Sequence, residues 1–168
     1  GVALLLKTGT VLMGSSPAAI KYCAFITGLL TLFIVYRLAL KFLSRTQALL
    51  FTAVFSSTPL MGILTWIVTP AVTLMACWAA AVLFIYKADR EEKKLWWALA
   101  GLFTGLAFDS KYTAVFLIPG LLLYLMAYPD RWRRIFSENI LLYVLACAVT
   151  ILPVYIWNAE HHWASISF

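Results

Sequence analysis

Two charged residues, Asp109 and Lys111, interrupt the mostly apolar stretch GLAFDSKYTAVFLIPGLLLYL. Lys7 and Lys21 also stand among apolar residues. A lysine ammonium is a compact positive charge on a long stem, and it binds phosphate as a point charge. Lys111, Lys21 and Lys7 are therefore candidates for binding the phosphate of a lipid carrier. The alternative is that they extend to lipid headgroups, with Asp109 as a local partner of Lys111.

Aromatic and polar side chains crowd the stretch WNAEHHW near the end of the sequence. Sugar sites combine flat aromatic faces with amide, imidazole and carboxylate groups that bind hydroxyls. Tryptophans at a membrane interface are the alternative explanation. Two adjacent histidines are too few ligands for a metal site, so neither a metal nor a cofactor is expected. The candidates for binding a sugar or an acceptor are Tyr112, Trp157, Asn158, His161, His162 and Trp163.

The composition decides what kind of elements must position these residues. Hydrophobic residues make up 64% of the 168 positions, charged residues make up 12%, and the mean hydropathy is +0.92. A soluble domain carries about a quarter charged residues. The sequence therefore predicts an all-α, polytopic transmembrane helical bundle, with membrane lipids as neighbours and no nucleic acid partner.

A transmembrane helix needs about 20 apolar residues, and about 17 suffice with tilt or bilayer thinning. The polar residues 109–111 divide a stretch that is too long for one span, and Pro59 and Pro119 are expected to kink theirs. The cysteines Cys23, Cys77 and Cys147 are expected to be buried, small side chains. The six predicted spans lie near residues 17–42, 47–68, 70–88, 95–108, 112–128 and 139–157.

The lysines and arginines predict the orientation, because cytoplasmic loops are enriched in them. Ten of the 13 cations fall in alternate loops, which we assign to the cytoplasm. Lys7, Lys21 and Lys111 fall on the opposite side, at the predicted outer boundary. The ten are Arg37, Lys41, Arg45, Lys87, Arg90, Lys93, Lys94, Arg131, Arg133 and Arg134.

The sequence begins at Gly1 without a methionine, and it stops soon after a hydrophilic turn. We expect residues 1–168 to form a partial transmembrane domain, with N-terminal and C-terminal parts of the parent protein missing. Residues 2–13 are apolar but short, and they are expected to form an interfacial or truncated segment.

Four stretches resemble the dolichyl-phosphate-mannose protein mannosyltransferase family, glycosyltransferase family 39, in its bacterial branch. The likeness extends to relatives of the aminoarabinose lipid A transferase, and the third and fourth stretches are the more specific. The stretches are SSPAAIKYCAFITGLLTLFIVYRLALKFLSRTQALL, TPAVTLMACWAAAVLFIY, WWALAGLFTGLAFDSKYTAVFLIPGLLLYL and LPVYIWNAEHHWASISF.

The resemblance implies a GT-C-like fold and an enzyme that transfers a hexosyl or pentosyl group from a polyprenyl-phosphate sugar. The acceptor is unknown, and transfer takes place at the outer membrane face. A bacterial inner membrane, with the site facing the periplasm, is the implied location. In the family, a lysine in the turn that corresponds to SKYTA lies near the donor phosphate, which implies this role for Lys111. A basic residue ahead of the first long span corresponds to Lys21.

Two features depart from the family pattern. The family usually carries an acidic residue directly after the Thr-Pro pair of an outer loop, and here Ala71 follows Thr69 and Pro70. The family's catalytic carboxylate lies in an outer loop that would precede Gly1. The general base is therefore unassigned, and residues 1–168 alone are not expected to be catalytically complete.

Two other functions remain open at this point. A transporter or flippase for a lipid-linked anion predicts ionisable residues in the middle of the bilayer and broken helices there. The charges of this sequence lie near the predicted span boundaries instead. A non-catalytic membrane subunit would need no binding site, and it predicts that the C-terminal tail tolerates substitution.

Overall fold

The computed structural model describes residues 7–11, 17–67 and 69–163, and these residues form helices and connecting turns without strands. A short helical stretch over residues 7–11 precedes the main elements. Most of residues 2–13, predicted to form an interfacial segment, lie outside the described residues. The main elements are α2 (Pro17–Ala39), α3 (Arg45–Ser56), α4 (Pro59–Trp66), α5 (Pro70–Glu91), α6 (Lys94–Ser110), η1 (Tyr112–Phe116), α7 (Leu117–Met126), α8 (Pro129–Trp132), η2 (Arg133–Phe136) and α9 (Glu138–Glu160).

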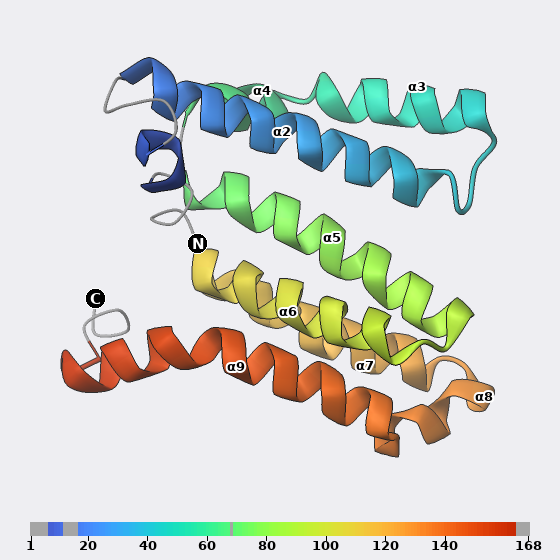
Figure 1. Ribbon diagram of the computed structural model, residues 1–168. Coiled ribbons are helices and arrows are strands. Elements are labelled where there is room, and N and C mark those ends of the chain that lie inside the picture. Colours follow the sequence, from blue (N-terminus) through green and yellow to red (C-terminus); the bar gives the residue numbers. More distant parts are fainter. Residues whose placement is uncertain (1–6, 12–16, 68, 164–168) are drawn as a thin grey trace.

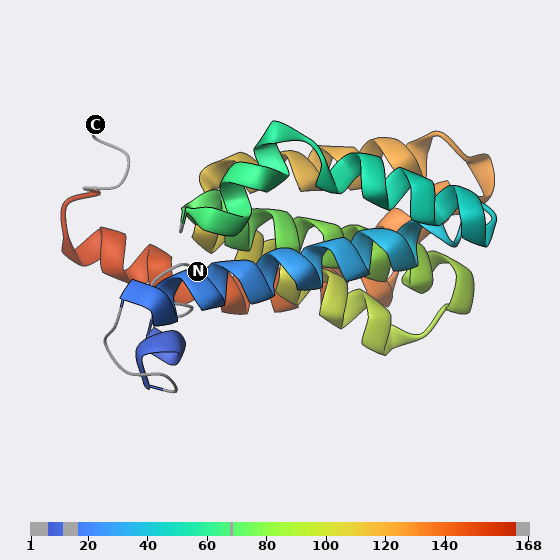
Figure 2. The same ribbon diagram turned by 90° about the horizontal axis from the view of Figure 1, so that it is seen from above.

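The long helices run back and forth along one direction, so that chain reversals gather at two ends (Figure 1). The basic end is where α2 and α5 finish and where α3, α6 and α9 begin. It carries the cations that the sequence assigns to the cytoplasm. The short stretch over 7–11, the start of α2 and the finish of α9 lie at the opposite end in both views (Figures 1 and 2).

Helix α6 is the centre of the packing, because it lies along α5 on one side and along α9 on the other. The contact with α9 is close: a Cβ atom on Gly101 would collide with the backbone of Tyr143, and one on Gly105 would collide with Thr150. Small residues four positions apart let helices approach closely in a membrane, where packing drives their association. Across this interface the Tyr143 hydroxyl donates a 3.0 Å hydrogen bond to Thr104 Oγ1.

The predicted span near 47–68 is divided into two helices. Helix α3 ends at Ser56, and α4 begins at Pro59 with a change of direction that Figure 2 shows. Proline is favourable in a first helical turn, where its missing N–H is not required. A second interruption follows α6, where Lys111 has an extended backbone with φ −159° and ψ 131° before the 3-10 turn η1. Pro119 therefore lies in the first turn of α7 instead of a helix interior.

Large apolar side chains cover much of the exterior. Helix α9 exposes Leu141, Val144, Leu145, Val149 and Leu152, while its buried residues are Tyr143, Cys147 and Asn158. A surface made of large apolar side chains is suited to contact with lipid tails rather than water. Helices long and apolar enough to cross a membrane are Lys21–Ala39, Pro70–Glu91 and Glu138–Glu160, with Tyr112–Met126 as a shorter apolar segment. The protein is an all-α, polytopic membrane bundle, as its composition predicts. The boundaries of six spans stay a prediction.

Buried hydroxyl groups inside the helices are satisfied locally. Thr27 donates to the carbonyl of Cys23, Thr31 to that of Thr27, and Thr104 to that of Ala100, at 2.7–2.8 Å. A threonine that bonds the carbonyl four residues earlier needs no partner on another helix. These groups therefore carry no indication of a binding site.

Candidate functional site

A hollow of about 430 Å³ lies where α6 gives way to η1, at the end opposite the basic end. Three parts of the chain meet there: the start of α5, the junction of α6 and η1, and the second half of α9. We call this site the α6 hollow. It is lined by Thr69, Pro70, Ala71, Phe108, Asp109, Ser110, Lys111, Tyr112 and Val154.

The end of α6 explains why polar residues reach this hollow. The N–H of Lys111 still bonds to the carbonyl of Ala107 at 3.0 Å, but its own φ and ψ are extended. The helix therefore finishes at Ser110, and Lys111 and Tyr112 follow a new direction. Tyr112 is held by an edge-on contact with Phe108, whose ring centre lies 5.2 Å away.

Polar atoms without a partner in the described chain gather at the α6 hollow. Asp109 Oδ1 and Thr69 Oγ1 are buried and find no hydrogen-bond partner among the described groups, and neither does Thr73 Oγ1, one turn further along α5. Buried polar groups in proteins are nearly always hydrogen-bonded, so such atoms need an explanation.

Asp109 and Lys111 do not form the local ion pair that the sequence suggested as one alternative. The ion pairs found among the described side chains join other residues. Side chains two positions apart do not face each other along a helix, and the extended Lys111 does not restore the contact. The half-buried carboxylate and the exposed ammonium therefore stand as separate groups at the same hollow.

The other two candidate cations lie at the same end but not in the hollow. Lys7 belongs to the short stretch over 7–11 and Lys21 to the first turns of α2, and both are exposed. Neither is among the described residues that line the α6 hollow. A shared phosphate site for Lys7, Lys21 and Lys111 thus receives no support from the lining, and the assignment stays a prediction.

The expected sugar-binding residues at the end of α9 form a separate aromatic group. Trp157 stacks on His161 with ring centres 4.3 Å apart, and Trp163 meets Tyr155 edge-on at 5.3 Å. The imidazole Nδ1 of His161 lies 2.8 Å from the Trp157 carbonyl oxygen. These residues are not among those that line the α6 hollow, whose contact with α9 is Val154.

Asn158 and His162 shape the end of α9. Asn158 is buried and donates from Nδ2 to the carbonyl of Val154 at 2.9 Å. Its own carbonyl accepts the N–H of Trp163 at 2.8 Å, and His162 between them has φ 53°. A six-residue closure over a left-handed residue is one of the two hydrogen bonds of a Schellman motif, in which glycine is the usual left-handed residue. In the described structure, His162 and Asn158 thus help to terminate the helix.

Thr69 and Val154 are residues of the α6 hollow that sequence reasoning did not select. The sequence held a signal for Thr69, because the Thr-Pro pair precedes a span whose start lies at the same end as residues 109–112. Ala71 lines the hollow as well, and it stands at the position where the resemblance led us to expect an acidic residue. Val154 had no such signal, since it is one apolar residue among many on α9.

The α6 hollow offers a positive charge, a carboxylate and hydroxyl groups, which is a set suited to a phosphorylated sugar. Among the described residues, no group of three or more His, Cys, Asp or Glu side chains could hold a metal ion.

Comparison with known proteins identifies the family. The model of the dolichyl-phosphate-mannose-protein mannosyltransferase family matches residues 1–157. Comparisons with curated proteins and with solved structures returned no match. The family match, the apolar helices and the polytopic fold agree with one another. The chain therefore belongs to the dolichyl-phosphate-mannose-protein mannosyltransferase family, whose members are membrane glycosyltransferases of the GT-C type that use lipid-linked sugar donors.

Proposed function

We propose that the protein transfers a sugar from a polyprenyl-phosphate donor to an acceptor at the outer face of the membrane, and that the α6 hollow receives the donor's phosphate and sugar. One observation carries this proposal: Lys111, Tyr112, Asp109 and Thr69 line one space at the end opposite the basic end. The positive-inside rule assigns the basic end to the cytoplasm. The hollow would then face the periplasm of a bacterial inner membrane.

Lys111 acts on the phosphate in this proposal. The lipid phosphate is the leaving group, and fixed positive charge stabilises the negative charge that develops on it. The Asp109 carboxylate and the Thr69 hydroxyl, which belong to residues that line the hollow, bond to hydroxyl groups of the sugar. The Tyr112 ring borders the same space.

Sugar transfer by the full-length protein tests the proposal. Lys111→Ala is expected to lower kcat by about a hundredfold, the scale reported for losing one group that stabilises developing charge. Lys111→Arg keeps the charge and should retain part of the rate. Lys41→Ala is the matched control, because Lys41 is an exposed lysine at the basic end. Equal rates for Lys111→Ala and wild type would remove Lys111 from the site.

Asp109→Asn tests the sugar contact separately. The amide keeps the size of the side chain but removes its charge and one strong acceptor. We expect KM for the donor to rise while the transfer of bound sugar changes less. A lowered kcat with unchanged KM would instead place Asp109 outside sugar recognition.

A transporter receives no support from the described interior. The one charged residue among the buried polar side chains of the described chain is Asp89, and it lies at the basic end in an ion pair with Arg131. Transport of an anion through the bundle predicts ionisable residues near the middle of the bilayer.

A further inference from the structure

A second cavity, of about 450 Å³, is a partly open groove between α5 and α7. We call it the α5–α7 groove. The close contacts of α5 are with α6, α2 and α4, and α7 stands across the groove from it. The groove is lined by Leu38, Phe42, Trp78, Val82, Ile85, Tyr86, Arg90, Phe116, Leu117, Gly120, Leu121, Tyr124, Tyr128 and Arg131.

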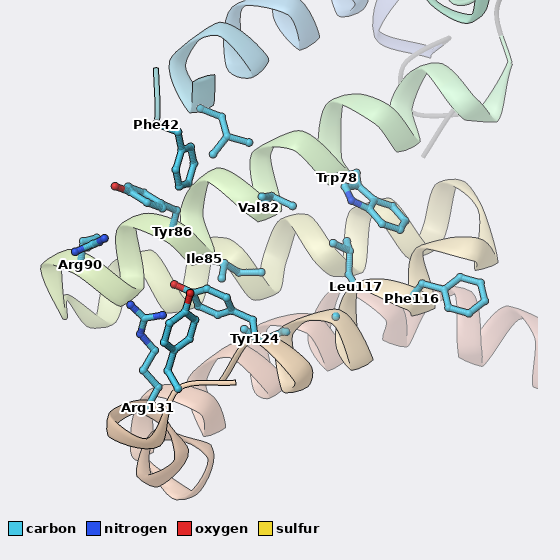
Figure 3. A pocket seen from close by; sticks show the side chains of 14 residues that line it. Phe42, Trp78, Val82, Ile85, Tyr86, Arg90, Phe116, Leu117, Tyr124 and Arg131 are labelled. Carbon is cyan, nitrogen blue, oxygen red and sulfur yellow. The ribbon is translucent and has the colours of Figure 1, made fainter. Parts of the chain in front are cut away.

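The groove is polar at one end and apolar along the rest of its length. Figure 3 shows Arg90 and Arg131 at the same end, near the hydroxyl of Tyr86, while Trp78 and Phe116 lie at the far end. The polar end belongs to the basic end of the bundle. A ligand that complements this arrangement has an anionic head and an apolar tail.

The two guanidinium groups differ in how they are held. Arg131 Nε lies 3.1 Å from Asp89 Oδ1, and its guanidinium stacks over the rings of Tyr124 and Tyr128. Asp89 also accepts a 2.8 Å hydrogen bond from the Tyr124 hydroxyl. The charge of Asp89 is therefore balanced by Arg131, and both are fixed in place.

Arg90 adds a charge that the described side chains leave unbalanced. It is exposed, its guanidinium lies 5.7 Å from the centre of the Tyr86 ring, and it forms no ion pair with a described carboxylate. A guanidinium offers paired N–H donors that match the oxygens of a phosphate. The polar end of the groove thus complements a single negative phosphate.

The length of the groove indicates which kind of amphiphile fits it. Trp78 and Arg90 lie twelve positions apart on α5, which corresponds to about 18 Å at roughly 1.5 Å per residue. One leaflet contributes about half of a hydrocarbon core that is about 30 Å thick. An acyl chain that extends from Arg90 to Trp78 therefore spans one leaflet.

We propose that the α5–α7 groove binds an anionic phospholipid of the leaflet at the basic end, with its phosphate at Arg90 and Arg131 and one acyl chain along Val82, Trp78 and Gly120. Cytoplasmic leaflets are rich in anionic lipids, and the positive-inside rule assigns the basic end to that side. This site is distinct from the α6 hollow, and it does not depend on the proposed sugar transfer.

Gly120 provides a variant that blocks the tail without disturbing the helix. No atom lies within 4 Å of the position that its Cβ would occupy, so a side chain there projects into free space. Gly120→Phe fills the groove, and Phe is also a better helix former than glycine. Gly62→Phe is the matched control, because Gly62 on α4 has equally open surroundings and is not among the described residues that line the groove.

The experiment counts lipids retained by the full-length protein in detergent, by native mass spectrometry, after addition of phosphatidylglycerol or phosphatidylcholine with identical acyl chains. We expect wild type and Gly62→Phe to retain one phosphatidylglycerol in preference to phosphatidylcholine. Gly120→Phe should retain neither. Arg90→Gln should lower the preference about fivefold, the factor for one arginine near an anionic surface. Arg37→Gln, an exposed arginine of α2 outside the groove, should match wild type.

The other occupants of the groove give different results. If Gly120→Phe and Arg90→Gln both retain lipid as wild type does, the groove is covered by protein and the proposal is wrong. If polyprenyl phosphate displaces the bound lipid from wild type at equal concentration, the groove holds the donor's tail, which also overturns the proposal. If Gly120→Phe does not fold, the comparison of Arg90→Gln with Arg37→Gln still tests the proposal. An equal preference of these two variants for phosphatidylglycerol over phosphatidylcholine would contradict a phosphate site at Arg90.

Discussion

Glycines serve opposite purposes at the two faces of the bundle. Gly101 and Gly105 on α6 lie against the backbone and side chains of α9, with no space for a Cβ atom. Gly120 on α7 faces the α5–α7 groove and has open space where its Cβ would be. The pair on α6 lets α6 and α9 approach each other, while Gly120 leaves a space between α5 and α7.

The two regions also differ in what ties their helices together. A buried hydrogen bond between Tyr143 and Thr104 crosses the interface of α6 and α9 near the two glycines. Among the described residues, the two sides of the α5–α7 groove are joined at the basic end, where Asp89 on α5 pairs with Arg131 on α8 and accepts a hydrogen bond from Tyr124 on α7. Close packing therefore stabilises the first region, and polar contacts at one end stabilise the second.

The largest effect is expected from filling the close interface. Gly101→Leu places a side chain against the backbone of Tyr143, which cannot move aside as a flexible side chain can. We expect a loss of at least about 3 kcal/mol in the free energy of unfolding, at or beyond the upper end for overpacking. Thermal unfolding of the full-length protein in detergent measures this. Gly62→Leu, at a helical glycine with open surroundings, should be no less stable than wild type, and an equal loss in both variants would contradict the close interface.

The second-largest loss of stability is expected from breaking the ion pair between Asp89 and Arg131 at the α5–α7 groove. Asp89 has a side chain that is 2% exposed, and Asp89→Ala leaves Arg131 without its carboxylate. Removing one partner of a buried pair costs about 3–5 kcal/mol, and we expect the lower end because Arg131 remains partly exposed and can be hydrated. The same unfolding assay applies. Glu138→Ala removes the exposed 2.8 Å pair with Lys94 and should have little effect. Comparable losses of stability in the two variants would mean that burial does not determine how much an ion pair contributes to stability.

The hydrogen bond across the close interface makes a smaller contribution. Tyr143→Phe keeps the ring and removes the donor to Thr104 Oγ1. We expect a cost of about 0.6 kcal/mol, the average for such bonds between transmembrane helices. A double-mutant cycle with Thr104→Val measures the coupling. Tyr22→Phe, at an exposed tyrosine of α2, is the control. Additive effects of the two substitutions would show that this bond does not stabilise the interface.

The smallest effect has the opposite sign. Gly120→Ala reduces the backbone entropy of the unfolded chain and adds a methyl group where no atom is near. A gain of about 0.5–1 kcal/mol is expected from helix propensity. Chemical unfolding of the two proteins side by side resolves a difference of this size when the slopes agree. A loss of stability would mean that α7 approaches α5 more closely than the groove indicates.

The sequence by itself determined the class of protein and showed that its basic residues fall in alternate loops. A chain with so few charged residues has too little polar surface for a soluble fold, whatever its detailed packing. Polar residues inside an apolar run also mark a break, and the helix does end beside Lys111. The likeness of four stretches to one family was likewise readable, because it depends on residue order alone. The match of the family model to residues 1–157 confirmed the family.

Only the tertiary structure decided which side chains meet. Thr69 and Asp109 are forty positions apart, and they border one hollow because α5 and α6 pack against each other with a particular rotation. Asp89 and Arg131 pair for the same reason, and the glycines of α6 face α9 instead of lipid. Hydropathy cannot specify these rotations, because lipid tails are as apolar as the interior of the bundle. The rotation of each helix is set by the shapes of the facing side chains, which become neighbours only in the folded structure.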